Sequence, residues 1–279
     1  MKITIKAPES AALYPHLKAC GFDGIDYSFP NWDKREYILS SDFERDLFET
    51  FDAMAAAGLS ATQCHLTYYA TNREPIGDGS YAAYEAAMLP VLERELALAA
   101  SLKIPTAVIH LFFTDEREAS QRGNLTLIGK LLPLLERYGI TLAIENIYGR
   151  DFSEIYLSSA EDLLFYIEHF NSPYVAACYD SGHAVARGQK PLEMLRRLGD
   201  KVAATHLHSN VPGRDLHQAP AMILSTFEWS KLGRTLREIG YKGNFNMEIS
   251  PWGLSGEARL AYYRMAYLIG VQLTSEEES

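Results

Sequence analysis

Six side chains of the kind that binds metal ions recur along this chain, each close to the end of an apolar run. They are spaced by about 30 to 45 residues, the length of one strand, one helix and two loops. Side chains at the same point of such a repeating unit meet at one rim of a closed barrel. The six are His65, His110, Glu145, Asp180, His208 and Glu248. We therefore expect them to build one site.

Three carboxylates and one imidazole of this set form a hard, mainly oxygen ligand shell. Such a shell suits Mn²⁺ or Mg²⁺, and Co²⁺ or Zn²⁺ are also compatible with it. The predicted ligands are Glu145, Asp180, His208 and Glu248. One bound divalent metal explains at once why so many costly polar groups end apolar runs.

Taken singly, each of these residues has a plainer explanation. Glu145 could pair with Arg150, Asp180 could cap a helix, and a histidine at a strand end is often a hydrogen-bonded interior residue. In the segment HLHSN, His206 and His208 share one strand face; we place His208 at the metal and His206 deeper.

The elements that must position these side chains are eight apolar segments separated by amphipathic helical stretches. Short, continuous apolar runs are typical of parallel strands covered by helices. No G-x-G-x-x-G motif follows the first segment, which disfavours an open doubly wound sheet. The segments are 3–7, 24–29, 60–68, 106–113, 141–147, 175–180, 202–209 and 245–250. The sequence predicts an α/β fold, a (β/α)₈ TIM barrel, as a single domain over residues 1–279.

Helix boundaries are indicated by local signals. Ser41 with Glu44 and Ser158 with Glu161 have the spacing of capping boxes. Pro90 lies inside a helical pattern over residues 80–102, so we expect a kink or two helices there.

Composition excludes several classes of function. The formal net charge of −10 disfavours a general nucleic-acid binder, because such affinity comes from clusters of Lys and Arg. Three cysteines without close pairs suggest a reducing compartment, and no apolar stretch is long enough for a signal peptide or a membrane span. We expect a cytoplasmic protein without membrane partners; the sequence leaves a homo-oligomer open.

Aromatic residues also follow the predicted strand ends. Trp32 and Trp252 are expected to contribute to the wall of a sugar-sized pocket, although ordinary loop packing explains each of them equally well.

The motifs together resemble the xylose-isomerase-like superfamily of sugar phosphate isomerases and epimerases, to which endonuclease IV is related. The resemblance covers nearly the whole chain and implies a small carbohydrate substrate. It is carried by IEN at 144–146, DSGHA at 180–184, HLHSN at 206–210, RDLH at 214–217 and MEIS at 247–250.

By resemblance to the ketose 3-epimerases, Glu145 and Glu248 would be both metal ligands and the acid–base pair. His183 and Arg214 would hold substrate oxygens, with His65 and His110 near the same substrate. The expected activity is isomerisation or epimerisation through an enediolate; a related dehydratase would begin with the same proton abstraction.

The resemblance to the endonuclease IV branch implies an alternative activity, that of a phosphodiesterase with three Zn²⁺ ions. All nine of its ligands have counterparts, the additional ones being His65, His110, His183, Asp215 and His217. Two departures oppose this alternative. The Gly-Glu-Gly element that should follow His217 is missing, and the loops expected at the rim mix charge signs.

Overall fold

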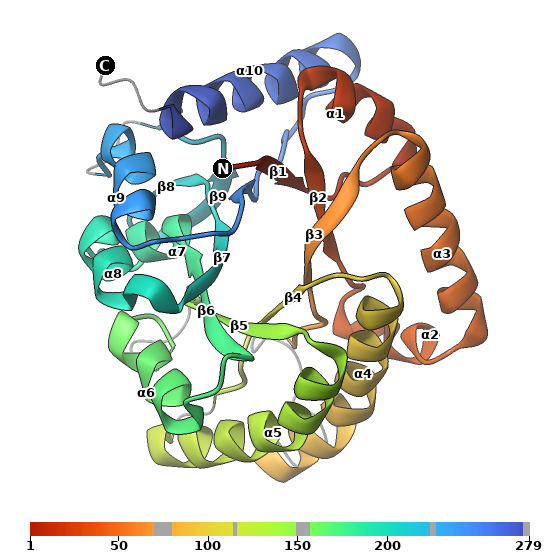
Figure 1. The fold of residues 1–279 in the computed structure, drawn as a ribbon, viewed down its shortest axis with the longest axis vertical. Helices are drawn as coiled ribbons and strands as arrows, with labels where there is room; N and C mark the ends of the chain where they lie inside the picture. Colours follow the sequence, from red (N-terminus) through yellow and green to blue (C-terminus); the bar gives the residue numbers. More distant parts are fainter. Residues whose placement is uncertain (70–79, 114–115, 149–156, 224–226, 276–279) are drawn as a thin grey trace.

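Eight parallel strands form a barrel with helices around it (Figure 1). The computed structural model describes residues 1–69, 80–113, 116–148, 157–223 and 227–275. Each strand pairs with its sequence neighbour, and the first pairs with the last, in the order β10-β1-β2-β3-β4-β5-β6-β7. A parallel bridge between Leu207 and Met247 joins the two ends of this order. The predicted TIM barrel is confirmed.

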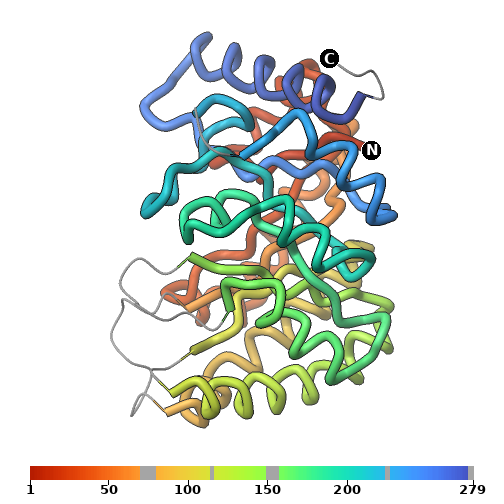
Figure 2. The backbone as a smooth tube through the Cα atoms, turned by 90° about the vertical axis from the view of Figure 1, so that its left-hand side faces the viewer, coloured from red at the N-terminus to blue at the C-terminus, as the bar shows by residue number. Residues whose placement is uncertain are grey.

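Seven of the eight barrel strands are shorter than the apolar runs that predicted them, and β6 matches its run. They are β1 (Ile3–Lys6), β2 (Gly24–Ser28), β3 (Ser60–His65), β4 (Thr106–Ile109), β5 (Thr141–Glu145), β6 (Val175–Asp180), β7 (Val202–His206) and β10 (Phe245–Met247). The difference lies at the carboxyl ends, where the chain leaves the sheet to form the rim. Figure 2 shows the segments that follow β4 and β5 leaving the barrel on the same side.

Helices follow most of the strands and cover the barrel from outside (Figure 1). The α-helices are α1 (Tyr14–Cys20), α2 (Arg35–Ile38), α3 (Ser41–Ala56), α4 (Tyr81–Ser101), α5 (Arg117–Tyr138), α6 (Ala160–Phe170), α7 (Ser181–Ala186), α8 (Pro191–Leu198), α9 (Leu232–Glu238) and α10 (Gly256–Thr274). Short 3-10 helices are η1 (Ala11–Leu13), η2 (Trp32–Lys34), η3 (Gly199–Lys201) and η4 (Trp229–Lys231).

The predicted caps lie one residue from the observed ones. The side chain of Ser40, not Ser41, caps α3, and the capping box of α6 is formed by Ser159 and Asp162. In both cases a neighbouring serine fits the same spacing rule. Pro90 is accommodated within one continuous helix, α4, rather than dividing it in two.

The barrel interior contains a layer of small side chains beneath the rim. Val108, Ala143, Cys178 and Ala204 form a buried cluster separate from the main core between strands and helices. Because strand side chains alternate, the residue two positions further along each strand points into the same interior. On β5, β6 and β7 those residues are Glu145, Asp180 and His206. The fold therefore stacks a polar layer directly above an apolar one.

A two-stranded hairpin, β8 (Ser209–Val211) with β9 (Arg214–Gln218), follows β7. It replaces the last residues of the long seventh strand predicted over 202–209. Among the described residues, no helix is both long and apolar enough to cross a lipid bilayer.

Candidate active site

The expected side chains gather around one cavity at the carboxyl ends of the strands. The cavity has a volume of about 340 Å³. It is lined by Lys6, Ser28, Phe29, Asn31, His65, Tyr68, His110, Glu145, His183, Asp215, His217 and Glu248. Active sites of (β/α)₈ barrels lie at this face.

Four ligand atoms, two of them from residues that line this cavity, lie within 4.8 Å of one another. They belong to Glu145, Asp180, His206 and Glu248, all of which are buried. His206 Nδ1 is 3.1 Å from Glu145 Oε2 and 3.4 Å from Glu248 Oε2. We call these four residues the central cluster.

The histidine of this cluster is not the one predicted. His206 is the last residue of β7 and lies in register with Asp180 on β6. His208 follows the end of the strand, and its Nε2 approaches Asp180 Oδ2 at 3.0 Å from the side of the hairpin. The prediction of a longer strand placed His208 at the rim, whereas β7 ends at His206, the histidine that lies beside Glu145 and Glu248.

The segment Asp180–Ser181–Gly182–His183 fixes the neighbouring geometry. Asp180 Oδ1 accepts a hydrogen bond of 2.6 Å from the backbone of His183, so Asp180 caps α7 while its other oxygen faces His208. Ser181 Oγ accepts from the His208 backbone N–H at 3.1 Å. A Cβ on Gly182 would lie 2.1 Å from the His208 ring, so this position requires glycine.

Asn146 connects the ends of β5 and β6. Its side-chain amide exchanges two hydrogen bonds of 2.8 Å with the backbone N–H and C=O of Asp180. Its own carbonyl lies 2.9 Å from His183 Nδ1. The IEN motif thus holds Glu145 and Asp180 at a fixed separation.

A second group, His65 with His110 and Glu145, lies on the side of β3 and β4. The Nε2 atoms of His65 and His110 are 3.2 and 3.1 Å from Glu145 Oε2. His65 Nδ1 is 2.8 Å from the carbonyl of Leu66, which leaves Nε2 to face the carboxylate. This grouping is the one expected from the sequence.

A third group, His208 with Asp215 and His217, lies on the hairpin side. His217 Nε2 is 3.1 Å from Asp215 Oδ2, and His183 Nε2 reaches the same oxygen at 3.5 Å. The backbone of His217 has a positive φ of 47°, a strained conformation for a residue other than glycine. His217 is held there by the contact of its Nδ1 with the Glu248 carbonyl and by a hydrogen bond from Ser250 N.

Lys6 is a site residue that the sequence argument missed. It is the last residue of β1, and its Nζ is 2.7 Å from Glu248 Oε1. A lysine that ends a predicted buried strand was the available signal, but only acids and imidazoles were considered as strand-end groups.

The electrostatics of the cavity keep the two glutamates ionised. Burial alone would raise the pKa of Glu145, but the imidazoles of His206 and His110 hold it well below its usual range. Burial alone would also raise the pKa of Glu248. The Lys6 ammonium and, to a smaller extent, the His206 imidazole hold that pKa well below its usual range. Burial alone would lower the pKa of His206, but Cys178, Glu145 and Glu248 raise it well above its ordinary value. The cluster therefore attracts positive charge.

Three predicted substrate contacts do not line the cavity. Arg214 is exposed at the start of β9, and Trp252 is 71% exposed. Trp32 is half-buried; its ring packs edge-on against Tyr69 and lies 4.6 Å from the Arg35 guanidinium carbon. Among the aromatic residues after strand ends, Phe29 and Tyr68 line the cavity instead. Arg150, the alternative partner of Glu145, lies outside the described residues.

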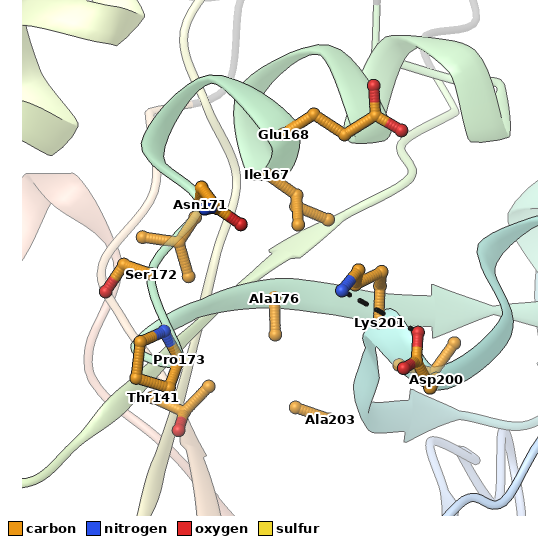
Figure 3. A pocket seen from close by; sticks show the side chains of 12 residues that line it. Thr141, Ile167, Glu168, Asn171, Ser172, Pro173, Ala176, Asp200, Lys201 and Ala203 are labelled. Atoms are coloured by element: carbon orange, nitrogen blue, oxygen red, sulfur yellow. Dashed lines mark ion pairs between the residues drawn. The ribbon is translucent and has the colours of Figure 1, made fainter.

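A larger cavity, of about 520 Å³, opens at the opposite mouth, where β5, β6 and β7 begin (Figure 3). Its lining includes small side chains such as Ala176 and Ala203, and one ion pair of 3.7 Å joins Lys201 to Asp200. It contains none of the grouped acids and imidazoles, so size does not identify the active site here.

The central cluster fits a hard divalent cation. Three of its four members are carboxylates, and oxygen-rich sets suit Mn²⁺ or Mg²⁺. Glu145 Oε1 and His206 Nδ1 are buried and make no hydrogen bond with the residues that the structure describes. Buried polar atoms are normally satisfied, and ligation would satisfy both.

Comparison by sequence identifies a family. The family model described as xylose isomerase-like TIM barrel matches residues 15–264. The chain is also 27% identical over 191 residues to the uncharacterized protein y4fM of Sinorhizobium fredii (strain NBRC 101917 / NGR234). That match covers 66% of this chain and 59% of the relative, less than two thirds of its length.

Comparison by structure finds the same fold in sugar epimerases. A D-psicose 3-epimerase solved in the presence of D-fructose has a TM-score of 0.77 at 17% identity, covering 99% of this chain and all of the other. A 3-keto-D-glucoside 4-epimerase from E. coli gives 0.74 at 18%, covering 97% and 99%. An L-ribulose 3-epimerase gives 0.72 at 16%, covering 98% and 94%. At these identities the likeness establishes the fold.

Proposed function

This chain belongs to the xylose isomerase-like TIM-barrel family, and from that premise we propose that it is a divalent-metal-dependent isomerase or epimerase of a sugar or sugar phosphate. The observation that carries the proposal is the central cluster. Glu145 and Glu248 both approach His206 Nδ1, and both line the cavity in which a substrate would lie. The epimerase activities named for structures with this fold support the same class of substrate.

We assign the metal site to Glu145, Asp180, His206 and Glu248, with His206 in the place first given to His208. A bound divalent cation would supply Lewis acidity, which acidifies the C–H bond beside a substrate carbonyl. The favoured ions are Mn²⁺ and Mg²⁺ because of the three carboxylates.

The protein's own groups then move the proton. Glu145 and Glu248 are held ionised by their cationic neighbours, so either can accept a proton from carbon. Lys6 fixes one oxygen of Glu248, whereas Glu145 Oε1 makes no hydrogen bond with any described residue and has the His183 imidazole 3.3 Å away. Return of the proton by the glutamate that took it, to the adjacent carbon, would isomerise the sugar. Inversion would require the other glutamate, after taking a proton from solvent, to deliver that proton to the opposite face of the planar enediolate.

Solvent deuterium exchange tests this proposal. The purified chain, loaded with Mn²⁺, is incubated with a panel of ketoses in D₂O, and deuterium at carbon is followed by NMR. We expect incorporation of deuterium with at least one ketose and its loss after the metal is removed with EDTA. Product that forms without deuterium, or exchange that survives EDTA, contradicts the mechanism.

The second candidate is the phosphodiesterase with three Zn²⁺ ions. The observation that favours it is the presence of further ligand groups on both sides of the central cluster, one around His110 and one around Asp215. The same histidines also fit substrate binding in an isomerase. Metal analysis with an assay on abasic DNA separates the two: three zinc ions per chain together with nicking would replace our proposal.

A further inference from the structure

We propose that the cavity wall formed at the ends of β1 and β2 binds an anionic group of the substrate, a carboxylate or a phosphate. The residues that hold this group are Lys6, Ser28 and Asn31, all of which line the cavity. This inference rests on the proposed function because it names the substrate class of the same site. We call these three residues the anion wall.

The lining of the cavity has two chemically different parts. Lys6 ends β1 and Ser28 ends β2, two strands that pair with each other, and the register places Ser28 beside His65 on β3. None of the described lining residues between Lys6 and Tyr68 is an acid. The acids of the lining come from the second half of the chain and are Glu145, Asp215 and Glu248. A substrate therefore meets acids along one part of the lining and hydrogen-bond donors along the other.

Lys6 supplies the charge of the anion wall. Its side chain is 35% exposed, and its Nζ makes one hydrogen bond with the described residues, of 2.7 Å, to Glu248 Oε1. An ammonium group has three N–H donors, so donors remain for a ligand. With a divalent cation on Glu248, this carboxylate is shared between two cations, and a partly buried ammonium is then favoured by a further negative charge. An anionic group on the substrate provides that charge.

Ser28 and Asn31 add neutral donors to this charge. Ser28 Oγ and the Asn31 side-chain amide make no hydrogen bond with the residues that the structure describes. The backbone that carries them is nevertheless fixed, because Phe29 N donates to the His65 carbonyl at 2.9 Å and Lys34 N donates to the Asn31 carbonyl at 2.8 Å. Donors on a fixed backbone lose little freedom when a ligand binds.

A lysine together with a hydroxyl and an amide is a set that suits carboxylate or phosphate oxygens. An anion accepts several hydrogen bonds at once, and those from a charged donor are the strong ones. A sugar hydroxyl is bound by neutral groups alone and gives no reason for a lysine in the wall. If Lys6 served only as the counter-ion of Glu248, the cavity would show no preference between charged and neutral sugars.

Isothermal titration calorimetry of the Mg²⁺-loaded chain tests this preference with D-fructose, D-fructose 6-phosphate and D-fructuronate, which share one carbon skeleton. We expect one of the two anionic sugars to bind more tightly than D-fructose, and the preferred one identifies phosphate or carboxylate as the recognised group. Asn31→Ala should reduce the ratio of the two affinities by about tenfold, the effect of one hydrogen bond to a charged group.

Asn244→Ala is the matched control, because this asparagine is also only partly buried but precedes β10 at the opposite mouth of the barrel. It should keep the wild-type ratio. Lys6→Met should remove the preference for the anionic sugar, and Lys6→Arg should retain it. Within each variant, the ratio of the two affinities cancels any effect that the substitution has through Glu248 on both ligands alike.

A second measurement needs no sugar and decides the matter if none of these three sugars binds. In the Mg²⁺-loaded chain with ¹⁵N-labelled asparagine, inorganic phosphate should shift the NMR signal of the Asn31 side-chain amide in a saturable way, and Lys6→Met should abolish this shift. A signal that phosphate leaves unchanged overturns the inference.

Two calorimetric results also overturn it. One is equal affinity for D-fructose and both anionic sugars. The other is a preference that survives both Asn31→Ala and Lys6→Met, since the anion would then bind the metal rather than the wall. Deuterium exchange with neutral ketoses alone removes the anion wall and keeps the proposed function. Phosphate binding at Asn31 without exchange in any sugar removes the proposed function and keeps the anion wall.

Discussion

Glu248 illustrates how neighbours decide the role of one residue. The Lys6 ammonium contacts one of its oxygens at 2.7 Å, and His206 and His217 lie 3.4 and 3.8 Å from the other. These cations oppose the effect of burial on the pKa of Glu248 and keep the carboxylate charged. A charged carboxylate at the cavity wall can bind a cation and can also accept a proton.

Glu248→Gln should abolish the exchange of solvent deuterium into substrate. The amide keeps the shape of the side chain but cannot accept the proton, and general acid–base catalysis typically contributes about 10²- to 10⁴-fold to the rate. The measurement is the NMR exchange assay at saturating Mn²⁺, with bound metal quantified in the same sample.

Glu168→Gln is the matched control, since Glu168 belongs to the cavity at the opposite mouth (Figure 3). The control should exchange at the wild-type rate. Exchange at the wild-type rate in metal-loaded Glu248→Gln would remove Glu248 from the proton transfer.

Residue types and spacing were sufficient to predict most of the site. Glu145, Asp180 and Glu248 end apolar runs, and that pattern alone brings them to one rim. The arrangement of His206 beside Glu145 and Glu248, and of His208 beside Asp180, was not accessible in this way, because both histidines lie on one face of the predicted strand. It depends on where β7 stops, which is determined by the hairpin and by the bridge from Leu207 to Met247. Lys6 acts through its ion pair with Glu248, at the end of another strand, which spacing does not reveal.

At the scale of elements, a buried acid on α4 joins two of the rim segments. Glu95 Oε2 accepts a hydrogen bond of 3.0 Å from Thr67 N, and its other oxygen contacts the Thr67 hydroxyl. That hydroxyl lies 2.7 Å from the carbonyl of Pro30. A hydroxyl has one proton, so when it donates to Pro30 the contact with Glu95 requires a proton on the carboxyl group. The segments after β2 and β3, which carry Phe29 and Tyr68, are tied to α4 in this way.

Burial raises the pKa of Glu95 to about 8, against hydrogen bonds from Thr67 that lower it. In the folded chain the group is therefore neutral up to about that pH, whereas the unfolded chain loses the proton above its ordinary value of 4.5. The contribution of the neutral Glu95 carboxyl to the free energy of unfolding is complete at low pH. It is lost as the pH rises towards 8, with a slope of up to about 1.4 kcal/mol per pH unit.

Glu95→Gln, which cannot ionise, should flatten this dependence. The measurement is urea unfolding of wild type and variant at several pH values between 5 and 8. The difference in unfolding free energy should grow with pH in favour of the variant. A constant difference across the range would show that Glu95 is ionised in the folded chain.

Elements were predicted by type rather than by boundary. The eight strands follow from their apolar runs, but most runs continue beyond the last ladder pair because rim residues such as Phe113 and Ile147 are buried too. Burial, not pairing, sets the length of an apolar run. The caps moved by one residue because adjacent serines satisfy the same rule, and the hairpin was not predicted because its first residue, Ser209, ends the seventh apolar run.

At the scale of the whole molecule, barrel closure makes the site. The central cluster takes one residue each from β5, β6 and β7, and one from the residue after β10. The strands β10 and β7 are the two ends of the sheet order, so Glu248 joins the others only because the bridge at Met247 brings these ends together. An open sheet with the same strands could not assemble this group.

The central claim is that one divalent cation is held by Glu145, Asp180, His206 and Glu248. Anomalous X-ray diffraction from crystals grown with Mn²⁺ tests it most directly, because the signal locates manganese independently of the protein atoms. We predict a principal peak within bonding distance of the three carboxylates and of His206 Nδ1. No peak at that position, or manganese bound only among His208, Asp215 and His217, would contradict the account.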